Sequence, residues 1–394
     1  MIEGRRKPEG VVIAMVARHK GAHGIQTHVR QVVTLLTARN QSVRVVHPGS
    51  WVPFLGEVLL APGRALRRTR LGPAVRLDRY WRRLVLERAL RREMRRHEPV
   101  VVYAQDPRSA HAALRARKPE HTPVVMAVHY NESQAQGLIA SGKLARGGAA
   151  ERAIRAFEAD LIPRLQGLVF VSDHMRSHTY EVVPEAQGIP SAVIPNFLHP
   201  LDRRPVTDES PLRDCITVGA LELRKNHSYL LHVLAEARRN GSRHTLTVVG
   251  DGPERGSLEK LATRLEVSDD VIFTGSRTDV DRLLQQHRVY VHSATMENCP
   301  FALLEAFRAG LPVVAAPVGG IPGVVGSDGA ARLWDLADPA GGAHVLADLL
   351  NDESVRTEAA ARALNRFQSV FTADVVGEQL LGFLTDVASR PTGR

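Results

Sequence analysis

Short runs of β-branched and other apolar residues alternate with segments of helical periodicity along most of the chain, and this limits the folds open to it. Residues 100–103, for example, are apolar at every position, which is typical of a strand covered on both faces in a parallel sheet. The alternation stops at residues 199–213, a stretch rich in proline and charge, and then begins again. The pattern therefore predicts an α/β protein of two facing Rossmann-like doubly wound domains with a cleft between them.

The same pattern places the individual elements. In the first half it predicts strands at 11–17, 42–46, 99–104, 123–128 and 167–171, and helices at 24–39, 107–117 and 150–163. In the second half it predicts strands at 215–219, 244–249, 271–273, 289–293 and 312–315, and helices at 226–239, 253–264, 279–286, 301–309, 340–350, 354–367 and 373–389. We expect an N-terminal domain over residues 1–198, a C-terminal domain over 199–372, and a last segment, 373–394, that packs back toward the N-terminal domain.

The positive charge of the chain is concentrated in one arginine-rich segment, residues 64–96. The 394 residues have a formal net charge of +10, and residues 61–98 hold thirteen arginines against four acidic residues. Because the excess is local, we do not expect a protein that coats nucleic acid. Apolar and arginine side chains separate onto two helical faces around residues 75–84, and the apolar stripe then shifts, which predicts a bend or restart after residue 85. The segment could bind an anionic membrane surface, face an anionic acceptor or be a solvated surface.

The cysteine content and the hydropathy of the chain indicate the cellular compartment to expect. Cys215 and Cys299 are far apart in sequence and fit neither a zinc site nor a disulfide framework, which suits a reducing compartment. The apolar run at 11–17 is too short for a signal peptide, and no stretch approaches the ~20 residues of a membrane span. We expect a soluble cytoplasmic protein, peripheral at the inner membrane face if the arginine-rich segment binds lipid.

The segment ENCPFALLE, residues 297–305, follows a predicted strand and opens a predicted helix. Pro300 lies just ahead of the helical pattern, where its fixed φ and missing N–H cost little, and the N–H groups of residues near 301–304 can bind an anion at the positive end of the helix dipole. Glu297 precedes this anion site and Glu305 lies one turn into the helix, so the two carboxylates can bind hydroxyl groups on either side of a pyrophosphate. The alternative is that both glutamates are ordinary surface charges.

The segment GALELRKNH, residues 219–227, also joins a strand to a helix. Arg224 and Lys225 lie where the strand ends, and two adjacent cations suit a diphosphate leaving group. Asn226 is a suitable N-cap for the following helix. The alternative is a solvated basic turn.

Four further strand ends give weaker signals. Gly250 follows one strand, residues 273–277 with Arg277 follow another, Gly24 starts the first helix, and His129 ends a strand on the cleft side. A hydrogen-bonded structural role is the alternative for His129. The acidic pair at residues 279 and 281 has the spacing of a metal-binding motif, but acids at a helix start are favoured by the dipole alone. The chain has neither GxGxxG nor GxxxxGK[ST], which disfavours nicotinamide binding and ATP hydrolysis.

Taken in order, these segments resemble the retaining glycosyltransferases of family 4, which have the two-domain GT-B fold. The matching motifs span most of residues 11–323, and their order and spacing are more specific than any one of them. They are GIQTHV, VVMAVH and IPN in the first half, and VGALELRKNH, GDGPERGSLEKLA, VIFTGSR, ENCPFALLEAFRAGLPVV and PVGGIP in the second.

The resemblance implies metal-independent, cofactor-free transfer of a hexose or N-acetylhexosamine from a nucleotide sugar, UDP favoured, to a hydroxyl acceptor with retention. It implies that Arg224 and Lys225 bind the donor phosphates, Glu297 the hydroxyls of the sugar and Glu305 the ribose. The diphosphate would bind the amides of Phe301, Ala302 and Leu303. The base would lie near Gly250 and residues 273–277 with Arg277, Gly219 would also belong to the donor-binding residues, and Gly24 and His129 would lie on the acceptor and sugar side.

Three positions depart from the family pattern. Ala220 stands where the family often has arginine, His23 precedes Gly24 where a second glycine is usual, and Gly323 replaces a glutamate. The first departure removes a phosphate contact or moves it elsewhere. For the second, His23 could either narrow the entrance on the acceptor side or contact a donor phosphate.

Two other functions stay open. A nucleotide-sugar epimerase on the same scaffold would bind the donor but need no acceptor, and it would release no nucleoside diphosphate. A non-catalytic scaffold or lipid-surface protein has no need for paired charges at strand ends, which Arg224, Lys225 and Glu297 supply.

Overall fold

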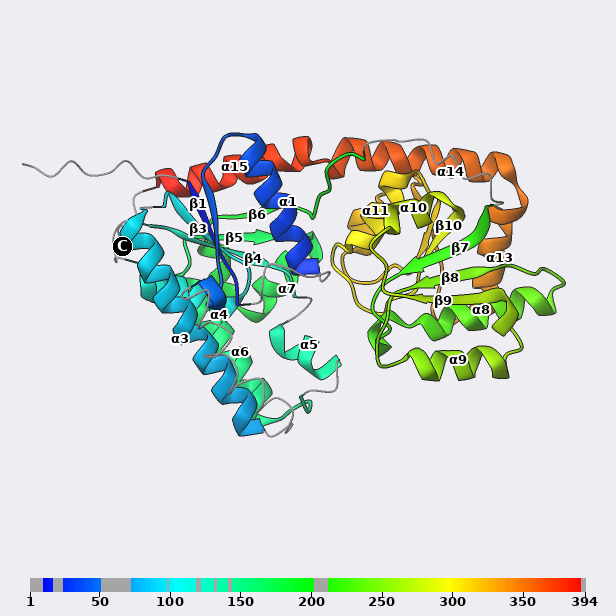
Figure 1. The fold of residues 1–394 in the computed structure, drawn as a ribbon, viewed down its shortest axis with the longest axis horizontal. Coiled ribbons are helices and arrows are strands. Elements are labelled where there is room, and N and C mark those ends of the chain that lie inside the picture. Colours follow the sequence, from blue (N-terminus) through cyan, green and yellow to red (C-terminus); the bar gives the residue numbers. More distant parts are fainter. Residues whose placement is uncertain are drawn as a thin grey trace, which may run out of the picture.

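The computed structural model describes residues 10–16, 24–50, 72–97, 99–117, 122–130, 133–140, 144–201 and 212–390, without the side chains of 72–80 and 140. Two α/β domains lie side by side, and the last helix crosses from the second to the first (Figure 1). Several sequence expectations fall outside the described residues: residue 17, His23, residues 64–71 of the arginine-rich segment and most of the linker.

The first domain is a six-stranded parallel sheet in the order β2-β1-β3-β4-β5-β6. Its strands are β1 (Val11–Ala14), β2 (Val43–Val46), β3 (Val101–Ala104), β4 (Val124–Val128), β5 (Gly167–Phe170) and β6 (Ser191–Val193). Its helices are α1 (Gly24–Ala38), α3 (Gly72–Arg96), α4 (Pro107–Ala116), α5 (Gln134–Ala140), α6 (Ala149–Leu161) and α7 (Asp173–Val182), with short turns η1 (Pro48–Ser50), η2 (Ile162–Arg164) and η3 (Pro184–Gly188).

The second domain is also a six-stranded parallel sheet, in the order β12-β11-β10-β7-β8-β9. Its strands are β7 (Arg213–Val218), β8 (Leu246–Val249), β9 (Val271–Gly275), β10 (His287–His292), β11 (Val313–Ala315) and β12 (Ala331–Leu333). Its helices are α8 (His227–Arg239), α9 (Arg255–Arg264), α10 (Val280–Gln285), α11 (Phe301–Ala309), α12 (Ile321–Val325), α13 (Pro339–Asn351) and α14 (Glu353–Arg366), with η4 (Leu223–Lys225), η5 (Ser268–Asp270) and η6 (Phe367–Phe371).

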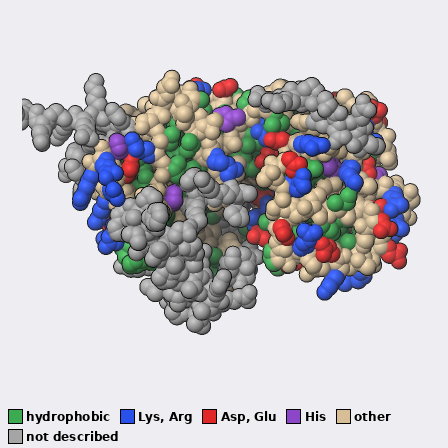
Figure 2. All heavy atoms as spheres, in the orientation of Figure 1, with side chains coloured by type: hydrophobic (Ala, Val, Ile, Leu, Met, Phe, Trp, Pro, Cys, Tyr) green, Lys and Arg blue, Asp and Glu red, His purple; other side chains and the backbone are tan. Residues whose placement is uncertain are grey.

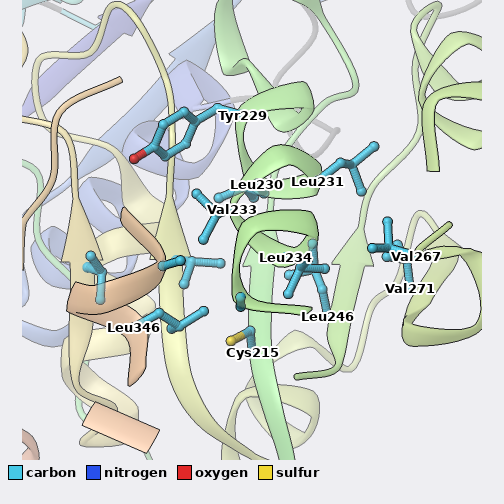
Figure 3. Close-up of a cluster of buried hydrophobic side chains, with 14 of the residues drawn as sticks. Cys215, Tyr229, Leu230, Leu231, Val233, Leu234, Leu246, Val267, Val271 and Leu346 are labelled. Atoms are coloured by element: carbon cyan, nitrogen blue, oxygen red, sulfur yellow. The ribbon is translucent and has the colours of Figure 1, made fainter. Parts of the chain in front are cut away.

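Each sheet is buried between helices on both faces, as its apolar strands require. In the second domain one core cluster joins Leu230 and Leu234 of α8 to Leu246 of β8 and Leu346 of α13 (Figure 3). A separate cluster on the other side of this sheet contains Leu303 and Phe307 of α11. The buried side of α11 fixes where its N-terminus lies, and this start belongs to the candidate site.

The last helix, α15 (Ala373–Ser389), packs on the first domain (Figure 1). Val376, Leu380 and Leu384 are buried in the same cluster as Leu35 of α1 and strand residues of the first sheet. The approach is close, because a Cβ added to Gly377 would lie 2.5 Å from Leu35. The chain of the second domain thus ends by completing the core of the first.

The two predicted doubly wound sheets are confirmed, but the pattern missed several short elements. These are β6, β12, α5, α7 and α12. β6 and β12 have only three residues each, which is too few to show a period. α5 contains Gly137, a poor helix former.

The expected restart in the arginine-rich segment is wrong. α3 is one uninterrupted helix of 25 residues that begins with Gly72 and Pro73. Proline suits a helix start, and no glycine or proline follows in the helix to break it. The shift of the apolar stripe therefore does not interrupt the helix.

Candidate active site

The candidate site lies where β7 and β10, the two central strands of the second sheet, end side by side. The strand order reverses between them, and ligands of doubly wound sheets bind at such a point. The two following loops are tied together, since the Thr295 amide donates to the Arg224 carbonyl at 2.9 Å and the Ser293 hydroxyl to the Asn226 carbonyl at 2.9 Å. The loop with the two cations is therefore held against the loop with Glu297.

Glu297 is buried and faces three basic side chains through one oxygen. Its Oε1 accepts a hydrogen bond from Lys225 Nζ, lies 3.4 Å from Arg224 Nη1 and is 4.0 Å from His292 Nε2. Burial raises the pKa of Glu297, but Lys225, His292 and Arg224 together outweigh it and hold that pKa below its usual value. Among the residues that the structure describes, none donates a hydrogen bond to Oε2. The carboxylate is thus charged, anchored at one oxygen and able to accept at the other.

The N-cap expected at Asn226 is wrong in its details. Asn226 precedes α8 in the left-handed region, at φ 51°, and its side chain makes no capping hydrogen bond. Its Oδ1 instead accepts from Ser228 Oγ at 3.0 Å, while its carbonyl accepts from Ser293. The turn is therefore shaped by the neighbouring β10 loop rather than by a helix cap.

Glycines allow the loops of the site to lie backbone against backbone. A Cβ on Gly319, whose φ is +55°, would lie 2.1 Å from the Glu297 carbonyl oxygen. The next residue, Gly320, donates its amide to the same carbonyl at 2.8 Å. Similarly, a Cβ on Gly250 would lie 1.9 Å from the carbonyl oxygen of Gly219, so the structure brings these two predicted residues together.

The start of α11 lies next to Glu297 in sequence and faces the first domain. A Cβ on Gly24, the first residue of α1, would be 4.0 Å from the Phe301 ring. Phe301 and Ala302 are half-buried, but Leu303 is buried in the core and its amide donates to the Pro300 carbonyl at 3.2 Å. The positive end of the helix therefore presents its first two residues more openly than Leu303.

Glu305 lies one turn into α11 and is half-buried. Burial raises the pKa of Glu305, and the effects of Arg308 and Arg30 only partly oppose this. Arg308 in turn pairs with Asp281 at 2.6 Å. Glu305 therefore lies near the site, and its ionised form is less favoured than that of Glu297.

The first domain contributes neutral imidazoles instead of ion pairs. His129 is 3.0 Å from Gln105 Oε1 through Nε2, and its ring packs edge-on against that of His28 at 4.6 Å between centroids. Burial, and then His28, hold the pKa of His129 well below its usual value. Burial also lowers the pKa of His28 to about 4, although Asn196 opposes the shift.

Two asparagines join the domains at the site. Asn196 Nδ2 donates to the Cys299 carbonyl at 2.6 Å, while its Oδ1 lies 3.0 Å from Nδ1 of His28. Asn298 Nδ2 donates to the Tyr130 carbonyl at 3.0 Å. The loop after Glu297 is therefore held by the first domain from both directions.

Two other groups of predicted residues are engaged in ion pairs of their own. Arg277 is half-exposed and forms two hydrogen bonds with Asp279, at 2.8 and 2.7 Å. Asp281 pairs with Arg308, so both acids of the metal-like spacing are engaged with arginines. Across the described ranges, no group of three His, Cys, Asp or Glu residues could hold a metal ion.

The sequence pattern assigned no role to His28, Gln105, Asn196, Asn298 or His292. Asn196 and Asn298 lie inside the quoted motifs IPN and ENCP, so the motif itself was the signal for both. His28 also lies inside a quoted motif, GIQTHV, whereas His292 is a buried polar residue that nothing local distinguishes from the other histidines of the chain.

Comparison with known proteins agrees with this geometry. Residues 22–200 match the family described as Glycosyltransferase Family 4, and residues 202–366 match Glycosyl transferases group 1. The N-acetyl-alpha-D-glucosaminyl L-malate synthase of Bacillus anthracis is 30% identical over 142 residues, which are 36% of this chain and 37% of that relative. The matched stretch is thus well under half of that relative's length.

Several solved structures, including the following two, resemble this chain over nearly its whole length. Sucrose-phosphate synthase from Thermosynechococcus elongatus has a TM-score of 0.73 and 15% identity, covering 96% of this chain and 99% of its own. HepE from Anabaena, in complex with UDP and glucose, has a TM-score of 0.67 and 17% identity, covering 96% and 100%. With the two family matches spanning both domains, this chain belongs to the family 4 type of glycosyltransferases with the GT-B fold.

Proposed function

We propose that this protein transfers a hexose or N-acetylhexosamine from a nucleoside diphosphate sugar to a hydroxyl acceptor, with retention at the anomeric carbon. The observation that carries the proposal is the state of Glu297, which is anchored at Oε1 by Lys225 and Arg224 while Oε2 accepts from none of the described residues. A buried, charged carboxylate beside two cations can bind sugar hydroxyls and a diphosphate at once. UDP is the nucleotide we favour, because the similar HepE structure holds UDP and glucose.

In this proposal each charged group of the site binds a different part of the donor. Lys225 and Arg224 turn toward the diphosphate, whose charge grows as the sugar leaves, and the amides at the start of α11 add to its stabilisation. Glu297 accepts hydroxyls of the sugar through Oε2, and Glu305 accepts those of the ribose. The base lies near Gly219 and Gly250.

The acceptor enters from the first domain, beside Gly24 and His129. Because Nε2–H donates to Gln105 Oε1, a neutral His129 can accept one hydrogen bond from a sugar or acceptor hydroxyl at Nδ1 without adding charge. No side chain is assigned as a nucleophile, so we propose departure and attack on the same face, with a phosphate oxygen taking the acceptor proton. The fixed cations supply the charge that a metal ion gives other sugar transferases, and the proposed reaction needs no metal or cofactor.

The first experiment is a thermal-shift screen with UDP, GDP and ADP and with UDP-glucose and UDP-N-acetylglucosamine, because a ligand of the folded state raises the melting temperature. The best donor is then incubated with a panel of hydroxyl acceptors, and nucleoside diphosphate and product are measured. Glycoside with a retained anomeric centre supports the proposal. A changed sugar nucleotide without release of diphosphate would identify the epimerase instead, which the comparisons do not favour.

Binding to a membrane surface is a separate proposal. Lys and Arg gather at one edge of the molecule over α3 (Figure 2), and a cavity of about 450 Å³ beside this helix is lined by Arg44, Arg92, Arg96 and Glu93 among others. None of the described helices has both the length and the hydropathy to cross a bilayer.

We propose peripheral binding of α3 to an anionic membrane face in the cytoplasm. Flotation with vesicles of anionic and of neutral lipid tests it, and absence of co-flotation at low salt would contradict it.

A further inference from the structure

His292, the last residue of β10, is buried and held on two sides. Its Nδ1 lies 3.2 Å from the Tyr290 hydroxyl, and its carbonyl accepts from Trp334 Nε1 at 3.1 Å. Its ring stacks on that of Tyr290, at 23° between the planes. The second ring nitrogen, Nε2, is buried without a hydrogen-bond partner and lies 4.0 Å from Glu297 Oε1.

The position of the ring proton follows from these neighbours. Burial, with Lys225 next in effect, lowers the pKa of His292 to about 3, so near neutral pH the ring carries a single proton. A lone pair on Nε2 would face the negative Glu297, whereas an N–H there is attracted to it. The favoured tautomer therefore has the proton on Nε2, and the Tyr290 hydroxyl donates to Nδ1.

The unpaired Nε2–H of His292 can form a hydrogen bond to Glu297 once the donor is bound. At present Lys225 and Arg224 approach Glu297 Oε1. In the proposed function both cations turn to the diphosphate, which would leave a buried carboxylate oxygen without a partner, an unfavourable state. His292 Nε2 already faces that oxygen, and a shift of about 1 Å brings it to hydrogen-bond distance.

We propose that His292 is a positioning residue for Glu297: when the diphosphate of the donor draws Lys225 away, the Nε2–H of His292 takes its place at Oε1. Oε2 then stays directed at the sugar. The inference rests on the proposed function, because it needs a diphosphate to move Lys225. It adds a residue that does not itself touch the donor.

A matched pair of variants separates this role from simple packing. In His292→Gln the side-chain amide reaches about as far as Nε2 and can still donate to Glu297. In His292→Asn the amide reaches only as far as Nδ1, so it can meet Tyr290 but not Glu297. Tyr290→Phe keeps a ring in the stack but removes the hydroxyl that fixes the tautomer, and it serves if His292→Asn fails to fold.

The experiment is a double-mutant cycle on nucleoside diphosphate binding, measured by calorimetry with whichever of UDP, GDP and ADP binds the unaltered protein best. We expect His292→Asn to weaken binding about tenfold or more, the scale for a lost hydrogen bond to a charge, and His292→Gln to restore most of it. Tyr290→Phe should weaken it a few-fold. In a Glu297→Gln background these effects should vanish, because a neutral amide does not need the replacement donor.

The outcomes distinguish the two proposals. If none of the three diphosphates binds the unaltered protein, the proposed function fails and this inference fails with it. If one binds, but His292→Asn and His292→Gln weaken it equally, the role of His292 is packing and only this inference is overturned. An effect of the same size in the Glu297→Gln background would overturn it too.

Discussion

The two domains have the same architecture but differ in charge where they meet: the second presents charged side chains and the first presents neutral ones. Each is a six-stranded parallel sheet, yet the order reverses between β1 and β3 in the first and between β7 and β10 in the second. Beyond β7 and β10 lie Lys225, Arg224 and Glu297, which are charged and paired. Beyond β3 and β4 lie Gln105 and His129, which are neutral.

In the proposed function this difference corresponds to a division of labour within one fold. A diphosphate needs fixed cations, and the second domain holds Arg224 and Lys225 in half-buried, hydrogen-bonded positions. A hydroxyl group needs only neutral donors and acceptors, and the first domain offers these. The predictions below test whether the charged side and the neutral side contribute unequally, as this comparison requires.

The largest effect is expected from the charged side. Lys225→Ala and Glu297→Ala should each lower the transfer rate by more than ~100-fold, the scale for loss of a preorganised electrostatic group. Steady-state kinetics with the best donor measures this. Lys260→Ala on α9 and Glu353→Gln on α14 change exposed residues of the same types and should leave the rate unaltered. Near-normal transfer rates in both Lys225→Ala and Glu297→Ala would show that these residues do not have the proposed roles.

The second effect concerns the backbone beneath Glu297. Gly319→Ala places a Cβ against the Glu297 carbonyl at a positive φ, so the loop must shift and transfer should fall by about tenfold. Gly323→Ala, a few residues later, meets no atom within 4 Å and lies in α12. It should leave activity intact and stabilise the helix slightly. Equal losses in the two variants would show that α12, and not the Glu297 loop, is sensitive.

The third prediction concerns the neutral side. The pKa of His28 is about 4 in the folded protein against 6.5 as its ordinary value, so between these pH values the unfolded chain binds a proton that the folded chain does not. Stability contributed by His28 is therefore present above about pH 6.5 and is lost as the pH falls toward 4. Melting temperatures at pH 7, 6 and 5 should fall less steeply in His28→Gln. An unchanged slope would mean that the imidazole is not buried as described.

The smallest effect is expected at the contact between the domains. Asn298→Ala removes the hydrogen bond to the Tyr130 carbonyl and should cost about 1 kcal/mol, or a few degrees in melting temperature. Asn365→Ala, at an exposed position of α14, is the control and should have no such effect. If both variants have the melting temperature of the unaltered protein, the interdomain hydrogen bond contributes no measurable stability.

Sequence reasoning performed best where a pattern repeats. Buried strands and long amphipathic helices have a period that can be read locally, and the two-sheet fold and the bounds of α15 followed from it. Elements of three residues, such as β6 and β12, have no period to read. Their strand state comes from pairing with β5 and β11, which only the assembled sheet provides.

The candidate site divides in the same way. Arg224, Lys225 and Glu297 could be predicted because each follows a strand inside a dense motif. The placement of Asn196 between His28 and Cys299 depends on residues 168 and 103 positions apart meeting in space. His292 lies close to Glu297 in sequence, but the burial of its ring beside that carboxylate also depends on Lys225 and Trp334, which are distant in sequence. A local motif can mark such a residue, as IPN marks Asn196, but it does not show which distant residue it meets.

The crossing of α15 also sets an order of events during synthesis. Its buried residues Val376, Leu380 and Leu384 complete the core of the first domain, which is translated before the second. The first domain must therefore wait, with an apolar face uncovered, until α15 has been made. Its final stability depends on translation of the second domain, although its own strands are made earlier.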